Sequence, residues 1–197
     1  MNFCCHRINT IKELKQIPEK YGVEIDLRDN QESSNIHLCH DPFELGEDFE
    51  EFLMNYNHSF IILNVKSERI EWKIIDLLKK YNIENYFFLD SSFPMIYQLA
   101  NKGERNIAIR FSEYEGLDTI INMKNKVSWV WVDCFTKNPL TLEIYKILKE
   151  MNYKLCFVSP ELQQQPEKLE EYKVFFKKNN IVFDMICTKY YNIDKWK

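Results

Sequence analysis

Short apolar runs alternate with amphipathic segments along the whole chain. Eight of the runs have the length of a strand and are rich in β-branched or aromatic residues, the composition that strands favour. They lie at 3–6, 23–27, 60–65, 86–89, 107–111, 127–132, 154–158 and 182–187. The segments between them carry apolar residues at helical spacing, which predicts a helix in each.

The predicted helices begin and end at residues with a clear local role. Thr10 and Glu13 have the spacing of a capping box, and Pro18 ends or kinks the helix that follows them. The last helix is expected to start at Pro166. The helical patterns cover 10–17, 49–56, 70–81, 94–100, 115–122, 142–151 and 166–178.

The regular order of strand and helix predicts an α/β fold with a parallel sheet. Eight units form either a closed (β/α)8 TIM barrel or an open, doubly wound sheet, and periodicity alone does not separate them. The chain has 197 residues, about 25 for each unit. That is enough for a strand, a helix and two short loops, so we expect one compact domain over 1–197 without a lid.

Residues that could act in catalysis or ligand binding lie at the ends of nearly all the predicted strands. In a barrel such residues form a ring around one mouth, whereas in an open sheet they gather mainly at one switch point. Their spread therefore favours the barrel. They are His6, Arg7, Glu24, Asp26, Arg28, Asp29, His40, Asp41, Asn64, Lys66, Asp90, Arg110, Asp133, Glu161 and Lys189.

Glu24 and Asp26 are two positions apart in an otherwise apolar strand. This spacing places both carboxylates on one face, where they repel each other unless they have a partner. One candidate partner is a divalent cation, Mg²⁺ or Ca²⁺, because both prefer hard oxygen ligands. The alternative is an ion pair with Arg28, Lys66 or Arg110.

Composition and charge narrow the class of protein. The net charge is -4 and the basic residues are scattered, so we expect neither nucleic acid nor a membrane surface as a partner. The chain shows no apolar signal segment and no stretch long enough to span a membrane. The six cysteines lack metal-ligand spacing, and we expect buried thiols in the reducing cytoplasm.

Four motifs resemble the signature of the glycerophosphodiester phosphodiesterases, in the same order. They are HR at 6–7, VEIDLR at 23–28, HDPF at 40–43 and LNVK at 63–66. The segment ICTKYY at 186–191 is similar to the last strand of that family, although Lys189 stands where the family usually has an acid. The resemblance implies a TIM barrel of the superfamily that includes phosphatidylinositol-specific phospholipase C. It also implies a metal-dependent phosphoric diester hydrolase.

The resemblance further implies roles for individual residues. His6 and His40 would be the acid/base pair, a role that suits side chains with pKa values near neutrality. Lys66 would neutralise the charge that develops on the phosphorus oxygens. We expect three basic residues to bind the phosphate, namely Arg7, Arg110 and Lys189.

The metal site departs from the pattern of the family. Glu24 and Asp26 match two of its ligands, but Asn64 replaces the third, which is a carboxylate. Metal binding is then weaker, or Asp133 or Glu113 completes the shell, or the barrel only binds a phosphorylated ligand. A lyase or transferase that uses a hydroxyl of the substrate itself is a further alternative. The short loop at 29–43 leaves no room for the usual insertion of the family, so we expect a small, glycerol- or polyol-type phosphodiester as substrate.

Overall fold

The computed structural model describes residues 1–29 and 34–197, which divide into two compact units. The N-terminal unit consists of Cys4–Leu99, and the C-terminal unit consists of Ala100–Lys197 together with Met1–Phe3. The expectation of one domain over 1–197 stays a prediction.

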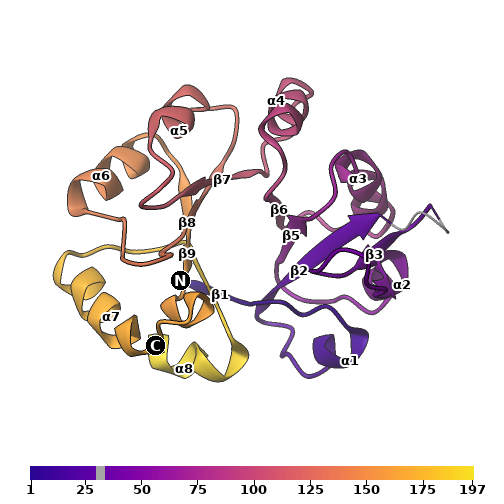
Figure 1. Cartoon of the computed structure of the whole chain (residues 1–197), viewed down its shortest axis with the longest axis horizontal. Coiled ribbons are helices and arrows are strands. Elements are labelled where there is room, and N and C mark those ends of the chain that lie inside the picture. Colours follow the sequence, from indigo (N-terminus) through magenta and orange to yellow (C-terminus); the bar gives the residue numbers. More distant parts are fainter. Residues whose placement is uncertain (30–33) are drawn as a thin grey trace. The chain divides into compact units, whose positions relative to one another are not determined.

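The N-terminal unit is built on parallel strands. The second half of β1 (Asn2–Cys5) pairs with β2 (Gly22–Asp29), which pairs with β5 (Ile61–Val65), and β5 pairs with β6 (Tyr86–Leu89). The helices α1 (Ile11–Leu14), α2 (Phe49–Met54), α3 (Glu71–Lys80) and most of α4 (Phe93–Asn101) follow these strands and lie outside them (Figure 1).

A small antiparallel extension of the N-terminal unit was not predicted. β3 (Ile36–Leu38) pairs with the end of β2 and with the two-residue strand β4 (Glu47–Asp48). The strands are so short that alternation along the sequence has too few positions to reveal them. They shape the segment that carries His40, and residues 30–33 of the expected loop lie outside the described residues.

The C-terminal unit repeats the strand–helix order. β7 (Ala108–Phe111), β8 (Trp129–Val132), β9 (Lys154–Val158) and β10 (Met185–Thr188) are parallel and pair in this order. The backbone N–H of Asn2 donates to Asp184 O beside β10. The helices are α5 (Asp118–Asn122), α6 (Leu142–Glu150), α7 (Leu169–Lys178) and α8 (Ile193–Trp196), with 3₁₀ turns at Pro160–Gln163, Pro166–Lys168 and Tyr190–Asn192.

All eight predicted strands are present, and the parallel α/β fold is confirmed. Over the described residues, however, no ladder joins β6 to β7. The strand pairing is thus that of an open sheet, and closure into a barrel is not confirmed.

Several local expectations hold. Thr10 accepts a hydrogen bond from the N–H of Glu13 and donates to its carboxylate, so the capping box is confirmed. The helix ends at Leu14, ahead of Pro18, and the α-helical part of the last predicted helix starts at Leu169 after a 3₁₀ turn at Pro166.

All six cysteines are buried free thiols. None of the helices in the described part of the chain is long and apolar enough to cross a membrane.

Candidate active site

The carboxylates of Glu24 and Asp26 lie on one face of β2, as the spacing predicts. Both residues are buried, with relative exposures of 0% and 1%. In the parallel ladder between β2 and β5, Asp26 is the partner of Asn64. The register of two strands therefore brings these acids next to an amide whose side chain is also buried.

The carboxylate of Glu24 is held by two N–H donors of the protein. Oε1 accepts a hydrogen bond from Asn64 Nδ2 at 2.8 Å, and Oε2 accepts one from the backbone N–H of Arg7 at 2.7 Å. His6 Nε2 lies 3.8 Å from Oε2. Burial raises the pKa of Glu24 above its usual range, although the hydrogen bond from Asn64 acts in the opposite direction.

Asp26 is tied to the loop after β1 by Asn9. Asn9 Nδ2 donates to Asp26 Oδ2, and the N–H of Asp26 donates to Asn9 Oδ1, both at 2.9 Å. Arg7 Nε lies 3.5 Å from Oδ2. Burial, and then the negative charge of Glu24, raise the pKa of Asp26. The two acids thus form a buried pair whose charge is costly.

Lys66 lies between two carboxylates of the N-terminal unit. Its Nζ is 3.7 Å from Asp26 Oδ1 and 3.2 Å from Asp90 Oδ2. The backbone at Asp90, directly after β6, is left-handed with a φ of 59°, a conformation uncommon for a residue other than glycine. Of the three cations weighed as ion-pair partners for the acids, Lys66 lies near Asp26.

His40 is partly exposed at the mouth of the site. Its Nδ1 is 2.8 Å from Asp41 Oδ1, and this hydrogen bond holds the pKa of Asp41 below its usual range. A bond at Nδ1 orients the imidazole ring and leaves Nε2 as the nitrogen that can exchange a proton with a ligand.

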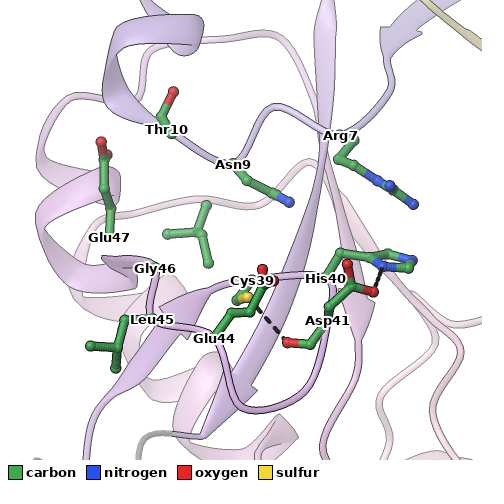
Figure 2. Close-up of a pocket in the computed structure, with 11 residues that line it drawn as sticks. Arg7, Asn9, Thr10, Cys39, His40, Asp41, Glu44, Leu45, Gly46 and Glu47 are labelled. Carbon is green, nitrogen blue, oxygen red and sulfur yellow. Dashed lines mark hydrogen bonds and ion pairs between the residues drawn. The ribbon is translucent and has the colours of Figure 1, made fainter.

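A cavity of about 490 Å³ adjoins these residues (Figure 2). Residues of the segments 7–10 and 38–47 line it, and Arg7 and His40 lie on one side of the view. A Cβ atom at Gly46 would lie 1.8 Å from the carbonyl oxygen of Leu38, so only glycine permits this approach. The close approach brings the segment after β3 against its strand and forms one wall of the cavity.

The buried oxygens fit a divalent cation. Asp26 Oδ1 and Asn64 Oδ1 are buried without a hydrogen-bond partner. Together with Glu24 they supply hard oxygen donors, two of them from carboxylates, and such donors suit Mg²⁺ and Ca²⁺. Among the described residues no three acid, histidine or cysteine side chains form a metal-binding group, which agrees with the amide at position 64.

The N-terminal unit brings together most of the residues that the sequence predicts. Glu24 contacts Arg7, Asn64 and, at longer range, His6, while Asp26 contacts Arg7 and Lys66. His40 joins them on the wall of the cavity that Arg7 also lines.

The other predicted residues lie in the C-terminal unit and have partners there. Arg110 forms an ion pair with Asp133, and the N–H of Lys189 donates to Glu161 at 3.4 Å. Asp133 accepts further hydrogen bonds from side chains of its own unit, and Glu113 accepts hydrogen bonds from Thr136. Phosphate binding by Arg110 and Lys189 stays a prediction, as does a metal role for Asp133 or Glu113.

Three residues of the site were not assigned a role from the sequence. Asn9 and Asp90 belong to none of the matching motifs, and their partners are distant in the chain. Asp41 is part of the HDPF segment, where its position directly after His40 was the available signal. Arg28 was considered as an ion-pair partner for the acids, but its guanidinium group donates to backbone carbonyls.

Nearly the whole chain is similar in fold to several solved structures. No family model and no curated protein matches it. Among solved structures it is similar to a "putative glycerophosphodiester phosphodiesterase" from Galdieria sulphuraria, with 18% identity, a TM-score of 0.72 and coverage of 96% of this chain and 94% of that one. A glycerophosphoryl diester phosphodiesterase from Parabacteroides distasonis ATCC 8503 gives 14% identity, a TM-score of 0.63 and coverage of 95% and 82%.

A glycerophosphodiester phosphodiesterase from Agrobacterium tumefaciens str. C58 also matches. It has 11% identity and a TM-score of 0.61, with coverage of 95% of this chain and 96% of that one. At such identities the likeness demonstrates the fold. The resemblance inferred from the four motifs is therefore confirmed in the structure, and the chain has the fold of this group.

Proposed function

We propose that the chain is a metal-dependent phosphodiesterase that hydrolyses a small glycerol- or polyol-type phosphodiester. The observation that carries the proposal is the buried pair Glu24 and Asp26, which lies within reach of His6, Arg7 and Lys66. The fold of the solved glycerophosphodiester phosphodiesterases supports it.

Charge neutralisation is the first requirement of this reaction, because a phosphodiester anion repels nucleophiles. Arg7 and Lys66 supply positive charge beside the buried acids, and Lys66 is suited to stabilise charge that develops on the phosphorus oxygens. In this proposal Arg110 and Lys189 are further phosphate ligands.

Glu24, Asp26 and Asn64 would hold a divalent cation, Mg²⁺ or Ca²⁺. When bound, the cation polarises the phosphoryl group and offsets its charge. Asn64 contributes an oxygen without a charge, which makes this a weaker site than three carboxylates would form. Asn9 donates to Asp26 Oδ2, which leaves Oδ1, 3.7 Å from Lys66 Nζ, as the carboxylate oxygen of Asp26 without a hydrogen bond.

The histidines move the protons. One imidazole takes the proton of the attacking water or of a neighbouring substrate hydroxyl, and the other protonates the leaving alkoxide. His40 is oriented by Asp41, and His6 is placed beside the carboxylate of Glu24.

The thiols and the cavity support a proposed cellular compartment and a proposed size of substrate. The six free, buried thiols are consistent with a reducing compartment, and we propose the cytoplasm. A small, dissolved diester fits a cavity of about 490 Å³. We propose no role for nucleic acid or membranes.

A diesterase assay tests the proposal directly. Purified protein is incubated with a panel of glycerophosphodiesters in Mg²⁺, Ca²⁺ or EDTA, and the released alcohol is measured. We expect turnover that EDTA abolishes, with kcat about 10²–10⁴-fold lower for His6→Ala and for His40→Ala. His58→Ala is the control, since His58 bonds to Ile17 O outside the site.

Other outcomes identify the alternatives. Turnover that is insensitive to EDTA would refute the metal assignment. Binding of inorganic phosphate without turnover of any diester would favour a non-catalytic phosphate-binding protein, for which Asn64 and Lys189 are the supporting departures from the family. A cyclic phosphate product would identify a lyase that uses a hydroxyl of the substrate.

A further inference from the structure

Arg28 joins the two segments that carry His40 and Lys66. Its Nε and Nη2 donate to the carbonyl oxygen of His40 at 3.2 and 2.9 Å. Its Nη1 donates to the carbonyl oxygen of Lys66 at 3.0 Å. One planar guanidinium group therefore holds the backbones of an acid/base residue and a cationic residue of the proposed site.

The side chain of Arg28 makes these contacts where the backbones of the two segments stop pairing with β2. The N–H of Cys39 donates to Asp26 O at 3.0 Å, and the N–H of Lys66 donates to Leu27 O at 2.9 Å. These bonds attach the segments on the two sides of β2 to its residues Asp26 and Leu27. The side chain of Arg28, one residue further along, extends the attachment to the carbonyls of His40 and Lys66.

The geometry requires arginine in particular. A guanidinium group presents five N–H donors in a rigid plane, so it can bond to two carbonyl groups on different segments at once. A lysine ammonium is a compact point charge on a flexible stem and lacks this fork. The same positive charge in another shape would leave at least one of the two segments less constrained.

We propose that Arg28 is a positioning residue that sets His40 and Lys66 relative to each other, an inference that rests on the proposed function. It contacts both through their backbone and acts on the reaction through them. A misplacement of about 1 Å in a catalytic group can cost about 100-fold in rate. We therefore expect the loss of one hydrogen bond from Arg28 to the backbone of His40 or Lys66 to lower kcat.

Arg105 provides a matched control. Its Nη1 donates to the carbonyl oxygens of Ala100 at 2.6 Å and Lys126 at 3.3 Å, so it too joins two backbone segments. It belongs to the C-terminal unit, and so do the residues of both carbonyl groups. Arg28→Lys and Arg105→Lys remove the same kind of contact, one from the site and one from elsewhere.

The experiment compares both variants with the unmodified protein in the diesterase assay with Mg²⁺ or Ca²⁺. For Arg28→Lys we expect kcat about 10–100-fold lower and KM within about twofold, and for Arg105→Lys both constants within about twofold. Arg28→Lys is also combined with His40→Ala. Because Arg28 acts partly through His40, its effect on kcat should shrink in that background.

Each result bears on the proposed positioning role of Arg28. The positioning role of Arg28 is overturned if kcat for Arg28→Lys stays within twofold of the unmodified protein, or if its loss equals that of Arg105→Lys. In either case, turnover by the unmodified protein still upholds the proposed function. Full additivity with His40→Ala overturns action through His40. Absence of turnover by the unmodified protein refutes the proposed function itself, and this is seen before any variant is compared.

Discussion

Replacement of Asn64 by aspartate tests the chemistry of the buried pair with almost no change of shape. Asn64→Asp puts an oxygen where Nδ2 now donates to Glu24 Oε1 at 2.8 Å. A hydrogen bond to a charged group is lost, which costs about 1.5–3 kcal/mol. A like charge is also added beside Glu24 and Asp26, and at roughly 4 Å and an effective dielectric constant of about 20 it costs about 4 kcal/mol when ionised.

Proton uptake by one carboxyl group relieves part of this repulsion. We therefore expect the metal-free variant to lose about 2–4 kcal/mol of unfolding free energy. For a chain of 197 residues this corresponds to a Tm about 5–15 °C lower in EDTA. A divalent cation reverses the effect, because it turns the three repelling acids into three charged ligands.

The assay is thermal unfolding in EDTA and in a series of Mg²⁺ and Ca²⁺ concentrations, for the unmodified protein and the variant. We expect the affinity of the variant for the cation to be at least about tenfold higher, or about 1.4 kcal/mol, and its Tm to recover as the cation is added. Asn57→Asp makes the same substitution at an exposed position and is the control. The reasoning is refuted if Asn64→Asp lowers Tm no more than this control, or if neither cation restores it.

Two further predictions concern residues around the site. Asn9→Ala leaves the N–H of Asp26 without its partner and removes a hydrogen bond to the carboxylate. We expect a loss of about 1–3 kcal/mol in unfolding free energy, measured by chemical denaturation, and a lower kcat in the diesterase assay. Unchanged values for both would contradict the role of Asn9. Burial raises the pKa of Glu71 above its ordinary 4.5, so the stability it contributes is complete below that value and declines as pH rises through the raised pKa. Glu71→Gln should abolish this decline and stabilise the protein at pH 8, by about 1.4 kcal/mol for each unit of the shift, whereas identical pH profiles of the two proteins would show that the group titrates normally.

Much of the site was predictable because strands and motifs are local features. Alternation along 23–27 places Glu24 and Asp26 on one face, and the structure has them there. The order of strands and helices predicts parallel pairing, which the ladders confirm. The strands β3 and β4 were missed because runs of three and two residues carry almost no periodic signal.

The partners of these residues were not predictable in the same way. Sequence left the neighbour of the acids open among Arg28, Lys66, Arg110 and a metal, since all are compatible with the charge pattern. The structure places Lys66 near Asp26, pairs Arg110 with Asp133 and turns Arg28 to the carbonyls of His40 and Lys66. A choice among donors of equal charge depends on distance, which only folding decides.

The sequence by itself determined the order of the elements, the face of β2 that carries the two acids and the residue types available to the chemistry. These follow from a period of two along a strand and from the identities of the side chains. The resemblance groups Asn64 with the two acids, but only the tertiary structure decided that Asn64 pairs with Asp26 and donates to Glu24, and that Asn9 holds Asp26 from the loop after β1. The physical reason is register: a shift by one residue would turn the side chain of Asn64 to the other face of β5, and no local pattern specifies which residue of one strand is paired with which residue of the next.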